Sequence, residues 1–397
     1  MKQDQLIDTD QKVASILKEM EQGFRIDVNV LIDLKRSLDK TLLSLQKRID
    51  GLFGRRVEVN SNKNLGSLLF EHLRLPSLRR TPTGDFSASV EVLERLMACC
   101  FNAHSILQPV TEFKRIQPLA KSVKTIFRKL DLHGRIHPEF NQSGCPTGRA
   151  YSYIQNIQRE VRKSLIPDSE ENVFIELDWS QQELRILGAL SQEPVLLDCF
   201  TNKEDLHKKV ISEMFHKPVS EVTDEERKAG KTINYALIFG QEAPGLAWKL
   251  NIPLKKAQEL IDQYFSSLPM IQKFKYESRE KFSNTGYAET VFGRKTKLNL
   301  IGPKRERELR RGFNHLMQGT AADILRLTLI RLSEALTGTE AKLKFCAHDS
   351  IYLEIKKEDS EEVAKLTRSV MEIDFMGVHL PVTIKTYHDF SMGEGNA

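Results

Sequence analysis

Residues 172–185 read NVFIELDWSQQELR, and this stretch decides the fold class of the chain. Apolar side chains stand at every second position from Val173 to Leu177, which predicts a β-strand over 172–179. Asp178 lies at the end of this strand. The strand is therefore expected to deliver a carboxylate to one end of a sheet.

A second pair of strands is predicted around residues 342–356, where apolar residues alternate on both sides of the polar turn His348-Asp349-Ser350. Helical periods fill the chain from about 181 to 285. Two distant strand segments thus each bring an aspartate to a chain end. This pattern favours a mixed α+β protein with a sheet-based site flanked by helical parts.

The chain is predicted to be mainly helical up to about residue 135. A single apolar stripe, with spacings of three and four residues, predicts one long helix over 28–53. Asp27 is a suitable N-cap and Gly54 a suitable stop. A turn-rich segment, 76–87, interrupts the helical pattern.

Two segments are rich in basic residues. Residues 113–130 (FKRIQPLAKSVKTIFRKL) hold six basic and no acidic side chains. Such a run is either a solvated helix face or a surface that binds phosphate groups, and Lys121 and Lys124 are candidates for those contacts. A second cluster, 294–311, holds eight basic and two acidic residues.

The composition is that of an ordinary globular protein. The chain has 397 residues, of which 40% are apolar and 28% charged, which excludes a mainly disordered or fibrous protein. No stretch approaches the roughly 20 apolar residues of a membrane-spanning helix, and the polar residues 1–10 do not resemble a signal peptide. The net charge of +5 does not by itself indicate a nucleic-acid partner. Five cysteines without a CxxC pair argue against a disulfide framework or a zinc site, so we expect a cytoplasmic protein.

The two strand-end aspartates are the first candidates for chemistry. A single aspartate at a turn usually caps the backbone, and this reading applies to Asp178 and Asp349 taken one at a time. As a pair they could hold two hard divalent cations through oxygen ligands. Two such metals can stabilise the attacking and leaving oxygens of a phosphoryl transfer, without requiring a third carboxylate.

A helix between these strands has a distinctive face. Arg227, Lys231, Tyr235 and Phe239 recur every four residues and so share one stripe. Two cations and two aromatic rings in this order suit a nucleotide triphosphate. A mixed face that packs on a neighbouring helix has the same spacing, so the spacing favours neither reading.

Five motifs resemble those of family A (polymerase-I-like) DNA polymerases, and they follow the family's order. They are TGR at 147–149, DWSQQELR at 178–185 (motif A, usually DYSQIELR), RKAGKTINYALIFG at 227–240 (motif B, usually RxxxKxxNFxxxYG), MQGTAAD at 317–323 and CAHDS at 346–350 (motif C, usually VHDE). Similarity at 65–70 and 87–96 extends the resemblance over nearly the whole chain.

The resemblance implies an α+β right-hand polymerase with an antiparallel palm sheet and largely helical thumb and fingers. It implies a thumb with N-terminal helices at 1–135, a palm at 136–195 and 302–397, and fingers at 196–301. The implied reaction is template-directed addition of dNTPs to a primer 3′ end by two-metal nucleotidyl transfer, with Mg²⁺, or Mn²⁺ as an alternative.

The resemblance also implies the partners and the cellular location of the enzyme. The partners would be primer-template DNA and dNTPs, and the location the cytoplasm of a bacterial or phage-infected cell, with the chain acting as a monomer. We expect no room upstream for the 3′–5′ exonuclease domain that precedes the thumb in this family. Intrinsic proofreading is then expected to be absent, and a separate exonuclease or replication proteins would be additional partners.

Roles for single residues follow from the same motifs. Asp178 and Asp349 would hold the metals, and Lys231 would also donate a proton to the pyrophosphate. Glu183 would crowd a ribose 2′-OH, and His207, which alone would be taken for a surface histidine, would join the triphosphate contacts. The nucleotide-binding residues would be Arg227, Lys231, Tyr235, Phe239, Glu183, His207 and Gln181. The DNA-binding residues would be Arg149, Asn156, Arg310, Asn314, Gln318, His348, Lys121 and Lys124.

The chain departs from the family pattern at several positions. Ser350 replaces the glutamate of motif C, a wording shared with single-subunit RNA polymerases. Trp179 and Gln182 replace a tyrosine and an apolar residue of motif A. Tyr235 and Phe239 exchange the usual phenylalanine and tyrosine of motif B, and the tyrosine at the first position is typical of members that accept dideoxynucleotides readily.

Two other functions are kept as alternatives. A single-subunit RNA polymerase is favoured by Ser350, whereas Glu183 argues against it because ribonucleotides need space there. A DNA-binding accessory protein without catalysis is the other alternative. The retained catalytic candidates argue against it; they are Asp178, Asp349, Arg227 and Lys231.

Overall fold

The computed structural model describes residues 3–81, 83–142, 144–145 and 147–390. Contacts within the chain divide it into two compact units. The first unit comprises Met1–Gln22, Pro138–Ser152 and Val173–Thr386, and the second comprises Gly23–His137, Tyr153–Asn172 and Tyr387–Ala397. None of the described helices is long and apolar enough to cross a membrane.

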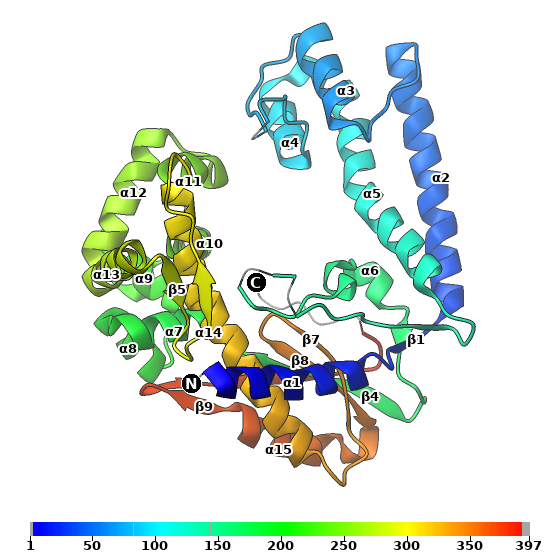
Figure 1. Cartoon of the computed structure of the whole chain (residues 1–397). Coiled ribbons are helices and arrows are strands. Elements are labelled where there is room, and N and C mark those ends of the chain that lie inside the picture. The colour runs from blue at the N-terminus through cyan, green and yellow to red at the C-terminus, as the bar shows by residue number, and fades with distance from the viewer. Residues whose placement is uncertain (1–2, 82, 143, 146, 391–397) are drawn as a thin grey trace. The chain divides into compact units, whose positions relative to one another are not determined.

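A four-stranded sheet forms the base of the first unit (Figure 1). Its strand order is β11 (Val382–Tyr387), β4 (Asn172–Trp179), β8 (Ser350–Lys356) and β7 (Lys342–Ala347). The predicted strand at 172–179 and the predicted pair around 342–356 are therefore confirmed, and so is the mixed α+β class. The sheet places two strands that are far apart in the sequence, β4 and β8, next to each other.

The β7–β8 hairpin is antiparallel and contains an irregularity. Its register shifts between Leu343 and Phe345, which interrupts the regular alternation that the sequence predicts for this strand. Lys344 at the shift is buried and pairs with the equally buried Glu354 at 3.0 Å. The alternation rule places charged residues at such positions in solvent, whereas here a buried partner compensates the charge.

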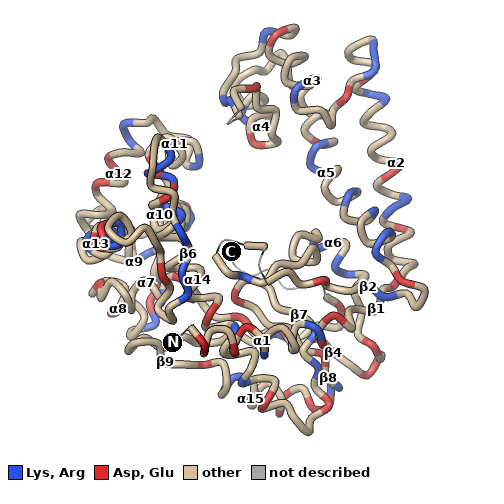
Figure 2. The backbone as a smooth tube through the Cα atoms, in the orientation of Figure 1, with Lys and Arg blue, Asp and Glu red and all other residues tan. Residues whose placement is uncertain are grey.

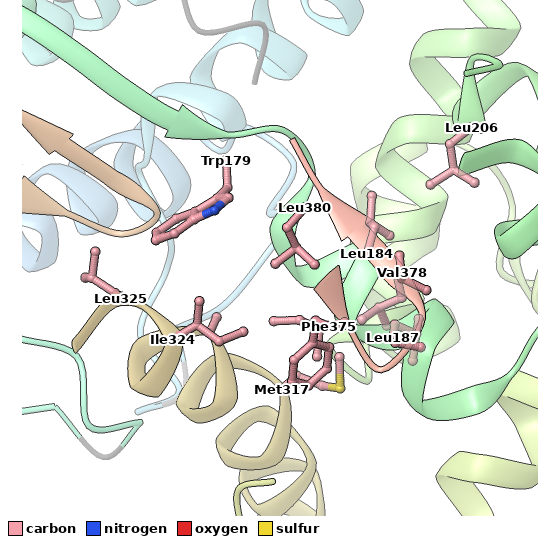
Figure 3. Packing of buried hydrophobic residues seen from close by; sticks show 14 of the residues in the cluster. Trp179, Leu184, Leu187, Leu206, Met317, Ile324, Leu325, Phe375, Val378 and Leu380 are labelled. Carbon is pink, nitrogen blue, oxygen red and sulfur yellow. The ribbon is translucent and has the colours of Figure 1, made fainter. Parts of the chain in front are cut away.

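The apolar core fixes the end of β4. Trp179 is 1% exposed, and its Nε1 donates to the backbone oxygen of Met371 at 3.0 Å. Figure 3 shows Trp179 in one apolar cluster with residues of α14 (Arg305–Ala335), the hairpin of β9 (Ile373–Phe375) and β10 (Val378–Leu380), and α7 (Gln182–Ser191). This packing holds the strand end that carries Asp178.

The first unit contains further helices and strands, some of which contact α14 directly. They are α1 (Gln3–Met20), α8 (Pro194–Thr201), α9 (Leu206–Phe215), α10 (Asp224–Ile238), α11 (Ala243–Leu250), α12 (Leu254–Ser267), α13 (Pro269–Thr285), β5 (Tyr287–Glu289), β6 (Lys295–Lys297) and α15 (Ser360–Met371). The helical run predicted up to residue 285 is confirmed. Helix α1 packs on α14 and β7, so the division by contacts differs from the predicted range 1–135 at its N-terminal end.

The second unit is built on two long helices that lie side by side, α2 (Val28–Phe53) and α5 (His104–Lys129) (Figure 1). The prediction for α2 is confirmed: the Asp27 side chain accepts from two amides of the first turn, and Gly54 ends the helix at φ +62°. The remaining elements are α3 (Asn62–Ser67), a π-helical turn (Leu68–His72), α4 (Val90–Cys99), α6 (Arg159–Arg162), and a small sheet of β2 (Arg135–Ile136), β1 (Phe24–Ile26) and β3 (Leu165–Ile166).

Candidate active site

The first unit brings the two predicted aspartates together. Asp178 is the penultimate residue of β4, and Asp349 lies in the turn that leads into β8. The amide of Trp179 donates to the backbone oxygen of Asp349 at 3.3 Å. The Ser350 hydroxyl donates to Asp178 Oδ1 at 2.5 Å. Hydrogen bonds of both backbone and side chains thus join the ends of the two strand segments.

The pKa of each of the two carboxyl groups is raised. Burial, and next the charge of Asp349, raises the pKa of Asp178 to about 7. Burial also raises the pKa of Asp349 to about 6, and the charges of Glu183 and Glu176 act in the same direction. Buried negative charges of this kind are stabilised by a cation, and carboxylate oxygens suit a hard divalent metal. The donor set therefore fits a divalent metal site.

Glu176 is a further acidic residue within electrostatic range of Asp178 and Asp349, and sequence reasoning missed it. Within the described part of the chain, no three His, Cys, Asp or Glu side chains are grouped so that they could hold a metal ion together. Glu176 stands two residues before Asp178 on β4, so both side chains lie on the same face of the strand. It is buried, and the hydroxyl of Tyr352 on β8 donates to its Oε1 at 2.9 Å. A charged residue within an otherwise apolar strand was the available signal in the sequence.

Glu183 in the first turn of α7 is paired with Arg149. The Nη2 of Arg149 donates to Glu183 Oε1, and the two side chains are 21% and 17% exposed. Burial raises the pKa of Glu183, whereas the charge of Arg149 opposes this shift. The structure thus joins a residue predicted to contact the nucleotide sugar to one predicted to contact DNA.

The motif B stripe lies on α10 and just beyond it. A capping box formed by Thr223 and Glu226 begins this helix. Arg227 near the N-terminus donates from Nε to Asp205 Oδ2 at 2.5 Å. Among the residues that the structure describes, no carboxylate pairs with Lys231, one turn further on. Burial, and next the charge of Arg227, lowers the pKa of Lys231.

The two rings of the stripe are stacked. The ring centroids of Tyr235 and Phe239 are 6.5 Å apart at an interplanar angle of 17°. Phe239 is the residue that follows the last helical turn, rather than a residue within α10. Burial raises the pKa of the Tyr235 hydroxyl, and the charges of Glu183, Asp349 and Asp178 add to the effect. The hydroxyl is therefore within electrostatic range of the carboxylates.

His207 on α9 completes this group, and the surface reading of this histidine is wrong. It is 4% exposed because α9 packs on α10, and its Nδ1 lies 3.0 Å from Asn234 Nδ2. Its ring centroid is 6.0 Å from that of Tyr235. Burial lowers its pKa to about 4, although the charge of Asp205 opposes the shift. The ring is thus neutral at pH 7.

The start of α7 contributes two glutamines. Gln181 is half-buried and takes a left-handed conformation with φ +55° just before the helix. Gln182, which replaces the apolar residue of the motif, is 1% exposed, and its Nε2 has no partner among the described atoms. Nothing in the structure explains this substitution.

The predicted DNA-binding residues fall in both units. Arg310, Asn314 and Gln318 are spaced four apart on α14 and so share one face. Arg310 pairs with Glu242, and the side-chain oxygen of Asn314 is buried with no partner among the described atoms. His348 is exposed in the turn before Asp349, with φ +56°.

The remaining DNA candidates belong to the second unit. Asn156 lies in a short 3₁₀ turn, Tyr153–Asn156, and Lys121 and Lys124 are exposed on α5. Figure 2 marks Lys and Arg positions in blue along the backbone of both α2 and α5. In the cluster at 294–311 of the first unit, by contrast, several charges already have carboxylate partners.

The sequence matches the model of DNA polymerase family A over residues 28–392. The chain belongs to DNA polymerase family A. DNA polymerase I of Geobacillus stearothermophilus is 32% identical over 406 residues, which cover 97% of this chain and 45% of that protein. The thermostable DNA polymerase I of Thermus aquaticus is 32% identical over 405 residues, covering 98% and 47%. The chain thus spans about half the length of these curated relatives.

A solved family A structure has the same fold. The POL domain of Pol1 from M. smegmatis, in a complex with DNA primer-template and dNTP, matches with a TM-score of 0.91 and 28% identity. The match covers 96% of this chain and 70% of that one.

The carboxylates of this family A site predict an unusual pH dependence of stability. Because the pKa of Asp178 is about 7 in the folded chain and roughly 3.9 in an unfolded one, the folded state binds the proton more tightly. The protonated Asp178 carboxyl therefore stabilises the folded state fully at a pH below the pKa of the unfolded chain. This stabilisation is lost as the pH rises towards the pKa of the folded chain. In the absence of metal, the free energy of unfolding of Asp178→Asn should therefore be higher than that of the wild type by roughly 1–3 kcal/mol at pH 8. At pH 4 the two proteins should have the same free energy of unfolding.

Urea unfolding in the presence of a chelator, at both pH values, measures this difference. Asp198→Asn, an exposed aspartate on α8, is the matched control and should not differ from the wild type. If Asp178→Asn and the wild type have the same pH dependence, the Asp178 carboxylate does not carry the buried charge inferred here.

Proposed function

We propose that this chain is a template-directed DNA polymerase that adds deoxynucleotides to a primer 3′ end. The proposal rests on one observation: the carboxylates of Asp178 and Asp349 are close enough to the Tyr235 hydroxyl for their charges to raise its pKa. Tyr235 lies on α10, the helix that also carries Arg227 and Lys231. Such a site has acidic groups for metals and basic groups for a triphosphate within one compact unit. We further propose that this unit contains the palm and fingers and the second unit the thumb.

Asp178 and Asp349 are the proposed ligands of two divalent ions, Mg²⁺ or Mn²⁺. When bound, such ions lower the pKa of the primer 3′-OH and neutralise the charge of the leaving pyrophosphate. Ser350, which stands where motif C usually has a glutamate, donates a hydrogen bond to Asp178. A neutral side chain would therefore orient Asp178 at this position. Glu176 adds a buried negative charge on the same strand face.

The helix α10 and its neighbour α9 are the proposed triphosphate-binding elements. Arg227 and Lys231 would bind the phosphates, and Asp205 would keep Arg227 oriented. Because the pKa of Lys231 is lowered, this residue is suited to donate a proton to the pyrophosphate. His207, neutral at pH 7, would donate a hydrogen bond to a phosphate oxygen rather than a positive charge. Gln181 is a further candidate contact.

The proposed DNA-binding residues lie in both units of the chain. Arg149, Asn314 and Gln318 would approach the new base pair from the minor groove, where acceptors are present at every pair and sequence is read only weakly. Arg310 would exchange its partner Glu242 for DNA, and His348 would meet the primer end. On the second unit, Asn156 would also contact the primer-template near the new pair. Lys121 and Lys124 would bind phosphates, so the loss of either lysine should weaken binding to all sequences alike.

Primer extension tests the proposal directly. A labelled primer-template is incubated with Mg²⁺ and either dNTPs or NTPs. We expect extension with dNTPs and little with NTPs. Efficient extension with NTPs would favour the RNA-polymerase alternative that Ser350 suggests, and DNA binding without any extension would favour a non-catalytic accessory protein.

Sugar selection depends in this proposal on Glu183. Glu183→Ala should raise the efficiency of ribonucleotide incorporation by roughly 10- to 100-fold relative to dNTPs, because a 2′-OH no longer meets a side chain. Single-nucleotide incorporation kinetics with matched dNTP and rNTP measure the ratio, and Glu204→Ala, an exposed glutamate outside the site, is the control. An unchanged ratio in Glu183→Ala would assign the selection to another residue.

A further inference from the structure

A series of ion pairs and hydrogen bonds connects the N-terminal helix α1 with the candidate active site. Asp10 on α1 receives two hydrogen bonds from Arg294, from Nη1 to Oδ2 at 2.8 Å and from Nη2 to Oδ1 at 2.9 Å. Its Oδ1 also lies 3.3 Å from Nε of Arg326 on α14. Figure 1 shows α1 beside α14, and both belong to the first unit. One carboxylate therefore contacts two guanidinium groups.

The two arginines are crowded into a largely buried place. Their side chains are 18% and 6% exposed. A second carboxylate, Asp323, lies 2.7 Å from Arg294 Nε and 3.8 Å from Arg326 Nη1. Thr290 donates to the other oxygen of Asp323 at 2.7 Å. The positive charges of the buried Arg326 and the largely buried Arg294 are thus balanced by the buried Asp323 and by Asp10, whose side chain is 39% exposed. Loss of either carboxylate leaves one of the two guanidinium charges without compensation.

The arginines in turn support the loop before Arg149. The Nη2 of Arg326 donates to the carbonyl oxygen of Gly148. Gly148 has φ +76°, and a Cβ at this position would stand 3.2 Å from Cδ of Arg294. The loop backbone therefore rests directly on both side chains. The next residue, Arg149, holds Glu183.

We propose that Asp10 is a positioning residue for the pair Arg149–Glu183, acting through Arg294, Arg326 and the carbonyl of Gly148. Without the Asp10 charge, two buried guanidinium groups share Asp323, repel each other and lose the geometry that supports the loop. Arg149 then holds Glu183 less firmly, and the Glu183 side chain excludes a ribose 2′-OH less strictly. This inference rests on the proposed function, in which Glu183 contacts the nucleotide sugar.

The variant Asp10→Asn tests the inference because it keeps the shape of the side chain and removes its charge. Asp8→Asn is the matched control: Asp8 lies on the same helix, its side chain is 60% exposed, and among the described residues its ion pair is with Lys12, at 2.8 Å. The readout is the ratio of kcat/KM for a dNTP to that for the matched rNTP. A variant that is merely less stable lowers both values equally, because the folded fraction cancels in the ratio.

We expect the ratio to fall at least fivefold in Asp10→Asn, to stay near the wild type in Asp8→Asn, and to recover largely in Asp10→Glu. Arg326→Lys, which keeps a positive charge and removes the bond to Gly148, should lower the ratio as well, and it carries the test if Asp10→Asn does not fold. An active wild type with the same ratio in both variants overturns the inference alone. A wild type that extends no primer overturns the proposed function, and this inference with it.

Discussion

Replacement of Asp178 or Asp349 by alanine should reduce primer extension by several orders of magnitude. Both carboxylates are proposed metal ligands, and Asp178 is joined to the neighbouring strand by the hydroxyl of Ser350. In the proposed reaction the metals stabilise both the attacking and the leaving oxygen, so the loss of one ligand affects the whole transition state. Single-turnover extension of a labelled primer, with saturating dNTP and Mg²⁺, measures the effect.

DNA binding separates this result from simple unfolding. Affinity for a primer-template comes mainly from phosphate contacts, so both alanine variants should bind DNA within a few fold of the wild type. Asp198→Ala on α8 is the matched control and should keep both activities. A further readout is stabilisation by metal: Mg²⁺ or Mn²⁺ should raise the melting temperature of the wild type and not that of Asp178→Ala. Near-normal extension by either alanine variant would refute the metal assignment.

The predictable features of this chain are those decided by local sequence. The helix α2 follows from one apolar stripe, a capping aspartate at Asp27 and a glycine stop at Gly54, all within one short segment. The strand end at Asp178 follows in the same way from alternation. Capping and periodicity act over a few residues, so a single sequence contains the whole of this information.

The features that sequence reasoning missed depend on contacts between distant segments. Glu176 becomes part of the site because β4 and β8 are neighbours, which places Tyr352 opposite it. His207 is buried because α9 packs on α10. Asp10 reaches Arg294 because α1 packs on α14. None of these pairings has a periodic signature, so a single sequence does not indicate which distant residue each of them meets.

Tyr235 offers a second sharp test of the proposed site. Its hydroxyl lies within electrostatic range of Glu183, Asp349 and Asp178, and burial with these charges raises its pKa, so it stays protonated at pH 7. A protonated hydroxyl can donate a hydrogen bond to a phosphate oxygen of the incoming nucleotide. A normal dNTP supplies this bond from its own 3′-OH, whereas a dideoxynucleotide cannot.

The tyrosine hydroxyl can therefore replace what a dideoxynucleotide lacks. A charge-assisted hydrogen bond of this kind contributes roughly 1.5–3 kcal/mol, which corresponds to about 10- to 150-fold in relative rate. The wild type should accordingly incorporate ddNTPs almost as readily as dNTPs. Tyr235→Phe should raise discrimination against ddNTPs by at least an order of magnitude and leave dNTP incorporation nearly unchanged.

Competition between a ddNTP and the matched dNTP, read as termination along a labelled primer, measures the discrimination in each enzyme. Tyr276→Phe is the matched control, because Tyr276 is 62% exposed on α13 and its hydroxyl donates to Glu280 on the same helix. The alternative is that the exchange of rings at Tyr235 and Phe239 changes packing alone, since the two rings are stacked on each other. In that case Phe239→Tyr would alter discrimination as much as Tyr235→Phe. Equal discrimination by the wild type and Tyr235→Phe would refute the role of the hydroxyl and leave the rings as packing surfaces.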